Sequence, residues 1–189
     1  MTVPNLLTVL RFVLVPVVVW AIADERDVVA FAVFVVAGVT DGVDGFIAKQ
    51  WQMTSRLGAY LDPLADKALL VSIFVALALS GDLPVWLVIT VVARDLLIVA
   101  AVVVSSLMGR VVPIRPLPIS KINTVAQILL VAMVLGDLAF SFGLMRERAA
   151  MVLIVAGLTA LSAAAYLVVW LRYMSDGSAA DLTEEDTQP

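Results

Sequence analysis

Long apolar runs, separated by short polar or turn-forming stretches, follow one another along the whole chain. Each run is about 20 residues long, which is the length that an α-helix needs to cross the hydrocarbon core of a membrane. The pattern predicts an all-α integral membrane protein, a bundle of six transmembrane helices. The expected helices cover residues 5–23, 28–48, 57–79, 83–107, 120–140 and 148–173. With six spans, both termini lie on the same side of the membrane.

The composition agrees with one membrane bundle and leaves no room for a second globular domain. Of the 189 residues, 62% are hydrophobic and only 15% are charged. We therefore expect a single six-helix transmembrane domain over residues 1–174. Residues 175–189 combine acidic side chains with Gly, Ser and Thr, and this composition is typical of a disordered, solvated tail.

The distribution of Lys and Arg predicts the orientation of the bundle. Eight basic residues lie on the side of the termini and three on the other side, when Arg94, in the middle of a span, is left out. Because basic residues are enriched in cytoplasmic loops, we expect both termini to be cytoplasmic. The protein is then a multi-pass protein of the inner (cytoplasmic) membrane.

Two residue types are missing, and their absence narrows the possible chemistry. The chain has no Cys and no His, so a disulfide, a thiolate metal site and a histidine base are all excluded. A metal ion here needs oxygen ligands, and a general base is expected to be a carboxylate.

Four aspartates lie near the ends of two consecutive apolar runs. Small and acidic residues share one face of the second expected helix, at its cytoplasmic end: Asp41, Asp44, Gly45 and Ala48. Similar residues share one face of the third, at its cytoplasmic beginning: Gly58, Asp62 and Asp66. The short connection makes the two helices antiparallel neighbours, so we expect the four carboxylates to converge in one pocket.

Four carboxylates in a medium of low dielectric repel one another, and cations must neutralise them. Oxygen ligands favour Mg²⁺, Mn²⁺ or Ca²⁺. Two such ions bridged by carboxylates stabilise the attacking and leaving oxygens of a phosphoryl displacement. A single Asp at a helix end is more often a cap, and small residues in membrane helices more often serve packing, but neither role explains all four carboxylates.

The motif Asp41-x-x-Asp44-Gly45-x-x-Ala48-Lys49, followed after eight residues by Gly58-x-x-x-Asp62-x-x-x-Asp66, resembles the signature of the CDP-alcohol phosphotransferases. This resemblance implies a six-helix membrane enzyme with its active site at the cytoplasmic side, and commonly a homodimer. It also implies metal-dependent transfer of a substituted phosphate from a CDP-linked donor to an alcohol, with release of CMP. We expect two Mg²⁺ or Mn²⁺ ions. Lys49 departs from the Arg that is usual in the family and loses its bidentate geometry.

The resemblance also implies a role for each residue of the motif. Asp41, Asp44 and Asp62 would bind metal, and Asp66 would bind the second metal and act as the catalytic base. The donor nucleotide would be bound by residues of the motif and of the opening segment "PNLLTVLR": Gly45, Ala48, Lys49, Gly58, Asn5, Thr8 and Arg11. Equally, Asn5 could cap a helix and Arg11 could anchor the helix at the membrane surface.

Two further segments, "ARDLLIV" and "VVPIRPLPISKINTVAQ", bear on the acceptor. We expect Arg110, Arg115 and Lys121 to bind an acceptor phosphate, although they could simply be cytoplasmic basic residues. Arg94 and Asp95, deep in an apolar run, fit a structural ion pair as well as a substrate site. Both segments resemble the cardiolipin-forming branch of the family more than the branch that forms phosphatidylglycerophosphate.

The resulting hypothesis is transfer of a phosphatidyl group from CDP-diacylglycerol to phosphatidylglycerol, which gives cardiolipin and CMP. The alternative acceptor is glycerol 3-phosphate, and the alternative of another class is a divalent-cation transporter, because carboxylates within membranes also mark ion pathways. The expected partners are these substrates, membrane lipids and a second copy of the chain. No nucleic acid is expected among them.

Overall fold

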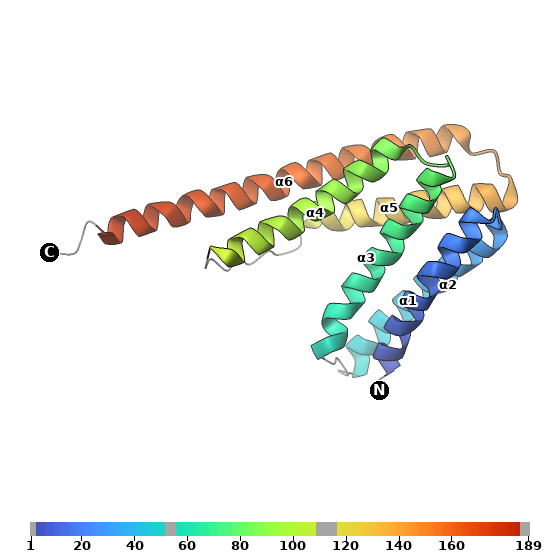
Figure 1. Cartoon of the computed structure of the whole chain (residues 1–189), viewed down its shortest axis with the longest axis horizontal. Coiled ribbons are helices and arrows are strands. Elements are labelled where there is room, and N and C mark those ends of the chain that lie inside the picture. Colours follow the sequence, from blue (N-terminus) through green and yellow to red (C-terminus); the bar gives the residue numbers. More distant parts are fainter. Residues whose placement is uncertain (1–2, 52–55, 109–116, 186–189) are drawn as a thin grey trace. The chain divides into compact units, whose positions relative to one another are not determined.

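Six α-helices make up the described part of the chain, which Figure 1 draws from a computed structural model. The structure describes residues 3–51, 56–108 and 117–185, and the side chains of residues 13–40, 65–108 and 117–174. Over these ranges no residue lies in a strand, so the all-α fold class is confirmed. The helices are α1 (Val3–Ala23), α2 (Asp27–Trp51), α3 (Arg56–Leu79), α4 (Val85–Leu107), α5 (Pro118–Phe140) and α6 (Met145–Glu185).

The end of α6 is where the structure differs most from the pattern-based prediction. The predicted helix ends at residue 173, whereas α6 continues to Glu185 and includes most of the segment for which we expected disorder. Ala179, Ala180 and Leu182 are good helix formers and compensate for Gly177. Residues 186–189 lie outside the described part of the chain.

Short turns with unusual backbone conformations end the apolar helices. Gly81 follows α3 with φ of 87°, and Gly143 precedes α6 with φ of 75°. Such positive values cost little for glycine, which has no Cβ atom. Glu25 and Ser141 also have positive φ, at 54° and 55°, in the turns after α1 and α5. The polar stretches after α1, α3 and α5, which separate apolar runs in the sequence, are thus turns in the structure.

The chain divides into two compact units. Unit 1 consists of Met1–Val88 and Gln127–Val152, and unit 2 consists of Ile89–Ala126 and Leu153–Pro189. Unit 1 contains all of α1, α2 and α3, the larger part of α5 and short parts of α4 and α6. Unit 2 contains most of α4, the beginning of α5 and most of α6.

The core of unit 1 forms where α1 packs against both α2 and α3. Val18, Ile73 and Leu77 are fully buried there. Phe31 of α2 meets Phe140 of α5 edge to face, with 5.4 Å between the ring centroids. Gly136 lies beside this aromatic pair, and a Cβ atom at that position would be 3.5 Å from the Phe31 ring, an ordinary van der Waals distance.

Arg148 of α6 connects the turns at one end of unit 1 through hydrogen bonds. Arg148 donates to Asp137 Oδ2 at 3.3 Å and to the backbone carbonyl of Asp82 at 2.7 Å. The other carboxylate oxygen of Asp137 accepts a hydrogen bond from the Leu144 backbone N–H at 3.0 Å. These contacts connect α5, the beginning of α6 and the turn between α3 and α4.

Three helical segments of the described chain are long and apolar enough to cross a membrane: Val85–Leu107, Pro118–Phe140 and Met145–Met174. Two shorter apolar segments, Val13–Ala23 and Asp27–Thr40, lie in α1 and α2. Large apolar side chains cover the exposed faces of the long segments, among them Leu96, Val99 and Leu153. An apolar exterior of this size is typical of a protein surrounded by lipid. The structure therefore supports an all-helical membrane protein, and the count of six spans stays a prediction.

Candidate active site

The aspartate positions of α2 continue a line of buried residues. Ala30, Phe34 and Ala37 are buried in unit 1 and are spaced four and three residues apart. The same helical steps lead from Ala37 to Asp41 and Asp44 within the unbroken helix. The two positions therefore lie on the side of α2 that packs into the unit earlier in the helix.

The aspartate positions of α3 follow the same rule in the opposite direction. Leu69 and Ile73 are buried in unit 1, and steps of three and four residues lead back from them to Asp66 and Asp62. The described side chain of Asp66 is half-buried. An ionisable residue at the inward edge of an apolar helix is expensive to keep and indicates a function.

Residues of α1 divide between two sides of that helix. Stepping back from buried Val18 by seven residues, two helical turns, leads to Arg11. Thr8 lies one turn before Arg11, whereas Asn5, six residues before it, lies on another side. Asn5 is also inside α1 and not at its first residue, which argues against the alternative role as a cap.

The three helix ends that carry the motif lie together in unit 1. Figure 1 shows the beginning of α1, the end of α2 and the beginning of α3 at the same end of the unit. The helical positions of the four aspartates are thus at one end of one bundle. The side chains of Asp41, Asp44 and Asp62 lie outside the described ones, so their convergence on Asp66 stays a prediction.

The four motif aspartates at this end of unit 1 are the candidate oxygen ligands for a metal. Among the side chains that the structure describes, no group of three or more potential metal ligands occurs. Four carboxylate positions, two on each of two helices that both pack against α1, on the inward sides, fit a hard divalent cation. The motif positions 45, 48, 49 and 58, proposed for the nucleotide, lie in the same helix ends, in α2 and α3.

Of the three residues expected to bind an acceptor phosphate, Lys121 can be located in the structure. It is an exposed residue in the first turn of α5, in unit 2. Arg110 and Arg115 lie outside the described residues. Their grouping with Lys121 stays a prediction.

Arg94 is the centre of a buried polar cluster in unit 2. Its side chain is 5% exposed, and its Nη1 atom donates to Asp95 Oδ1 at 2.8 Å. Nη2 donates to Ser162 Oγ at 2.7 Å and also to Ser120 Oγ. The guanidinium group therefore joins α4 to the beginning of α5 and to α6.

Tyr166 extends the polar cluster around Arg94. The Arg94 guanidinium lies over its ring, 5.6 Å from the centroid, and the backbone N–H of Leu117 donates to its hydroxyl oxygen at 3.2 Å. Two turns earlier on α6, buried Thr159 donates to Asn123 Oδ1 of α5 at 3.0 Å. The beginning of α5 is thus fixed by hydrogen bonds from both neighbouring helices, which supports the structural role for Arg94 and Asp95.

Sequence reasoning missed the α6 members of this cluster, although the sequence contains a signal for them. Thr159, Ser162 and Tyr166 are spaced i, i+3, i+7 in an otherwise apolar span and share one face of α6. All three are buried. A polar stripe on a membrane helix indicates hydrogen bonding to a neighbouring helix.

We expect Arg94→Ala to destabilise the protein strongly, because the change leaves Ser120 and Ser162 without their buried donor. Removal of one partner of a buried ion pair costs about 3 kcal/mol or more. For a chain of this size that corresponds to a Tm lower by roughly 6–12 °C. Thermal unfolding in detergent measures the shift, with Arg146→Ala, an exposed Arg of α6, as the control. Equal Tm values for the two variants would contradict a structural role for Arg94.

The fold and the site together define a class: a helical membrane protein with an acidic motif at one end of a bundle of three helices. Comparison with known protein families agrees with this class, since the model of the CDP-alcohol phosphatidyltransferase family matches residues 1–174. The chain belongs to the CDP-alcohol phosphatidyltransferase family.

Relatives with assigned activities fall into two branches of the family. The chain is 37% identical to a cardiolipin synthase (CMP-forming) of Rattus norvegicus and 36% identical to that of Homo sapiens, in each case over 75% of this chain and 52% of the relative. It is 40% identical to a probable phosphatidylglycerophosphate synthase of Mycobacterium tuberculosis, over 49% of this chain and 47% of the relative. The chain spans about half the length of these relatives.

Proposed function

We propose that the protein is a phospholipid synthase that transfers the phosphatidyl group of CDP-diacylglycerol to phosphatidylglycerol and forms cardiolipin and CMP. The observation that carries the proposal is the position of the complete family motif, which follows the buried sides of α2 and α3 to one end of unit 1. The match to the cardiolipin synthase of Rattus norvegicus covers 75% of the chain, against 68% and 49% for two relatives of the glycerol 3-phosphate-using branch, and this somewhat broader match supports phosphatidylglycerol as the proposed acceptor.

Asp66 is the proposed catalytic base. Its half-buried carboxylate would accept the proton of the acceptor hydroxyl as the hydroxyl oxygen attacks the phosphorus of the phosphatidyl group. The bond between this phosphorus and the bridging oxygen of the diphosphate breaks, and CMP leaves. A carboxylate suits this role because the chain contains no histidine.

The remaining aspartates are proposed to hold metal. Asp41, Asp44 and Asp62, together with Asp66, would bind two Mg²⁺ or Mn²⁺ ions, which supply positive charge to the donor diphosphate when bound. Gly45, Ala48 and Gly58 leave space for the cytidine, and Lys49, Thr8 and Arg11 would contact the donor, with Lys49 near its phosphates. Asn5 is kept as a weaker candidate, because it lies on another side of α1.

The proposal includes the membrane in which the protein lies and its orientation there. Six spans with cytoplasmic termini in an inner (cytoplasmic) membrane place the motif end of unit 1 at the cytoplasmic face, where a CDP-linked donor and soluble cations are available. Lys121, with Arg110 and Arg115, would bind the acceptor phosphate. A homodimer is proposed from the family resemblance, and light scattering of the purified protein in detergent measures the number of chains.

An acceptor panel tests the proposed function. Purified protein is incubated with CDP-diacylglycerol and Mg²⁺ or Mn²⁺, and phosphatidylglycerol, glycerol 3-phosphate and inositol phosphate are offered separately. We expect CMP release and cardiolipin formation with phosphatidylglycerol. The measurements are CMP release and identification of the lipid product by mass spectrometry, with Asp66→Asn as the inactive control.

The other outcomes of the panel distinguish the alternatives. Product from glycerol 3-phosphate alone would assign the chain to the phosphatidylglycerophosphate-forming branch and would leave the family and the role of Asp66 unchanged. The divalent-cation transporter is disfavoured by membership in a transferase family. Cation flux in vesicles, together with no CMP release from CDP-diacylglycerol in the presence of any acceptor, would restore the transporter hypothesis.

A further inference from the structure

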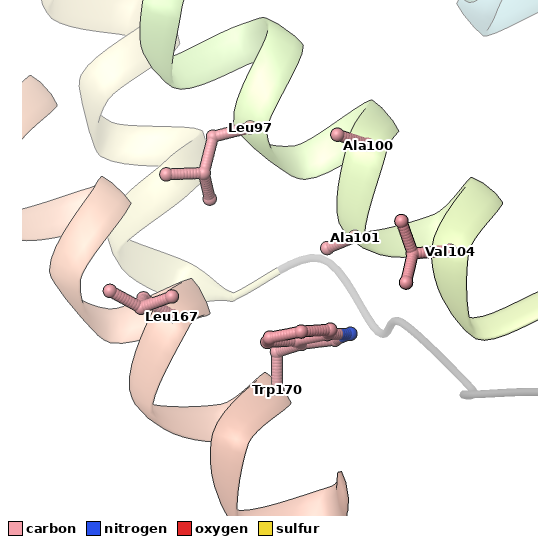
Figure 2. A pocket seen from close by; sticks show the side chains of 6 residues that line it. All are labelled: Leu97, Ala100, Ala101, Val104, Leu167 and Trp170. Carbon is pink, nitrogen blue, oxygen red and sulfur yellow. The ribbon is translucent and has the colours of Figure 1, made fainter.

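An apolar groove lies on unit 2 between α4 and α6. Its volume is about 190 Å³, and it is lined by Leu97, Ala100, Ala101 and Val104 of α4 and by Leu167 and Trp170 of α6. Figure 2 shows the side chains of Leu97 and Leu167 on one side of this groove and those of Val104 and Trp170 farther along, with the two alanines between. The groove is open because an alanine extends no farther than its Cβ atom.

Hydrogen bonding keeps the groove apolar and holds its wall in place. The indole N–H of Trp170 donates to Ser105 Oγ at 2.9 Å, and the hydroxyl of Ser105 donates to the backbone carbonyl of Ala101 at 2.6 Å. The polar atom of Trp170 is therefore occupied by buried Ser105, which does not line the groove. The aromatic face of Trp170 is left to line it.

The surroundings of the groove indicate what fills it. Both helices that line it are long and apolar enough to span a membrane, so the groove opens toward hydrocarbon. Within lipid the hydrophobic effect does not drive association, and an unfilled groove loses dispersion contacts. A flexible acyl chain restores those contacts along a narrow, wholly apolar surface.

A second copy of the chain fits the groove less well than an acyl chain does. Stable protein interfaces use about 20–30 residues on each side. Six residues line this groove, and two of them are alanines. With about 190 Å³ and six lining residues, the groove suits part of one hydrocarbon chain better than a helix of another protein.

The neighbours of the groove connect it with the residue proposed to bind the acceptor phosphate. On α4 it begins at Leu97, one turn beyond Arg94, which is bonded to Ser120 beside Lys121. On α6 the groove includes Leu167, which is next to Tyr166. The Tyr166 hydroxyl oxygen accepts a hydrogen bond from the backbone N–H of Leu117.

We propose that the groove between α4 and α6 binds one acyl chain of the phospholipid acceptor. This inference rests on the proposed function, since a synthase that uses glycerol 3-phosphate needs no acyl-chain site for its acceptor. The groove would then contribute to selection of phosphatidylglycerol, while Lys121 supplies the contact with its phosphate.

Trp170 makes the proposal directly measurable, because it lines the groove and the chain has only four tryptophans. In the full chain with Trp20, Trp51 and Trp86 changed to Phe, its fluorescence is followed in phosphatidylcholine vesicles as phosphatidylglycerol with brominated acyl chains is added. We expect quenching that saturates at a mole fraction several-fold lower than for a variant that keeps only Trp86, an exposed residue of α4. Unlabelled phosphatidylglycerol should reverse this quenching.

A substitution that fills the groove and an equally bulky one outside it form a matched pair of variants. Ala101→Phe places a ring in the groove and should remove most of the saturable quenching and raise the KM for phosphatidylglycerol several-fold, with the KM for CDP-diacylglycerol unchanged. Val103→Phe makes a bulky change on the same helix at an exposed position that does not line the groove, and should change neither quantity. Ala100→Phe serves as a second plug if the first variant does not fold.

Three results would overturn the proposal. Quenching proportional to the mole fraction, as for Trp86, would show that Trp170 contacts only bulk lipid. Equal quenching by brominated phosphatidylcholine would show the same. Absence of quenching means that protein covers the groove. These readings do not depend on turnover: cardiolipin formation without saturable quenching refutes the groove alone, and absence of cardiolipin formation in the acceptor panel refutes the proposed function.

Discussion

Asp66→Asn is expected to abolish phosphatidyl transfer while leaving the binding of CDP-diacylglycerol largely intact. The amide keeps the size of the carboxylate but cannot accept the proton of the acceptor hydroxyl. Loss of a positioned general base lowers a rate by about 10²–10⁴-fold. The change also removes one oxygen ligand for a metal, which places the expected loss at the upper end of this range.

Two measurements separate catalysis from folding and donor binding for this variant. CMP release gives kcat, and titration with a non-hydrolysable donor analogue gives the Kd, which should change no more than a few-fold. Asp24→Asn is the matched control, because Asp24 is an exposed residue in the turn after α1. Its turnover should equal that of the unchanged protein. Near-normal turnover of Asp66→Asn would require another base.

Removal of divalent cations is expected to stop turnover completely and reversibly. Four carboxylates at one end of unit 1 would repel one another and the donor diphosphate without cations to neutralise them. The assay is CMP release after exhaustive treatment with EDTA, followed by addition of Mg²⁺ or Mn²⁺. Full activity of the metal-free protein would contradict the assignment of all four aspartates.

A variant links this metal requirement to the motif. Asp41→Ala should raise the cation concentration that gives half-maximal activity and weaken donor binding, because the donor diphosphate shares the metal. Asp137→Ala is a comparison on α5, where the carboxylate pairs with Arg148 in the structure. It should reduce stability without changing the cation requirement. Identical cation titrations for the two variants would argue against Asp41 as a ligand.

Most of the fold was predictable from the sequence because of the way membrane helices are built. A span must satisfy its backbone hydrogen bonds internally and present apolar side chains over about 20 residues, so its length and position can be read from a single run of residues. Helix ends agreed with the structure to within three residues, apart from the end of α6. That end has no apolar run to define it, and local helix propensity in the segment after residue 175 decided the outcome.

The aspartate positions were predictable for a related reason. Within one unbroken helix, spacing alone determines which residues share a face, so the grouping on α2 and on α3 required no tertiary information. The direction of those faces did require it. Buried Ala37 and Leu69 show that the motif sides of the two helices continue sides that pack into unit 1.

The sequence by itself determined the class of protein, the helices, the motif and the family to which its spacing points. The tertiary structure decided what Arg94 contacts, because its partners Ser120 and Ser162 are 26 and 68 residues away along the chain. It also decided that Ala100 and Ala101 leave a groove opposite Leu167. Contacts between helices depend on how each is rotated and shifted against its neighbours. In lipid this depends on close packing and hydrogen bonds between particular side chains, which the pattern of apolar residues along the chain does not specify.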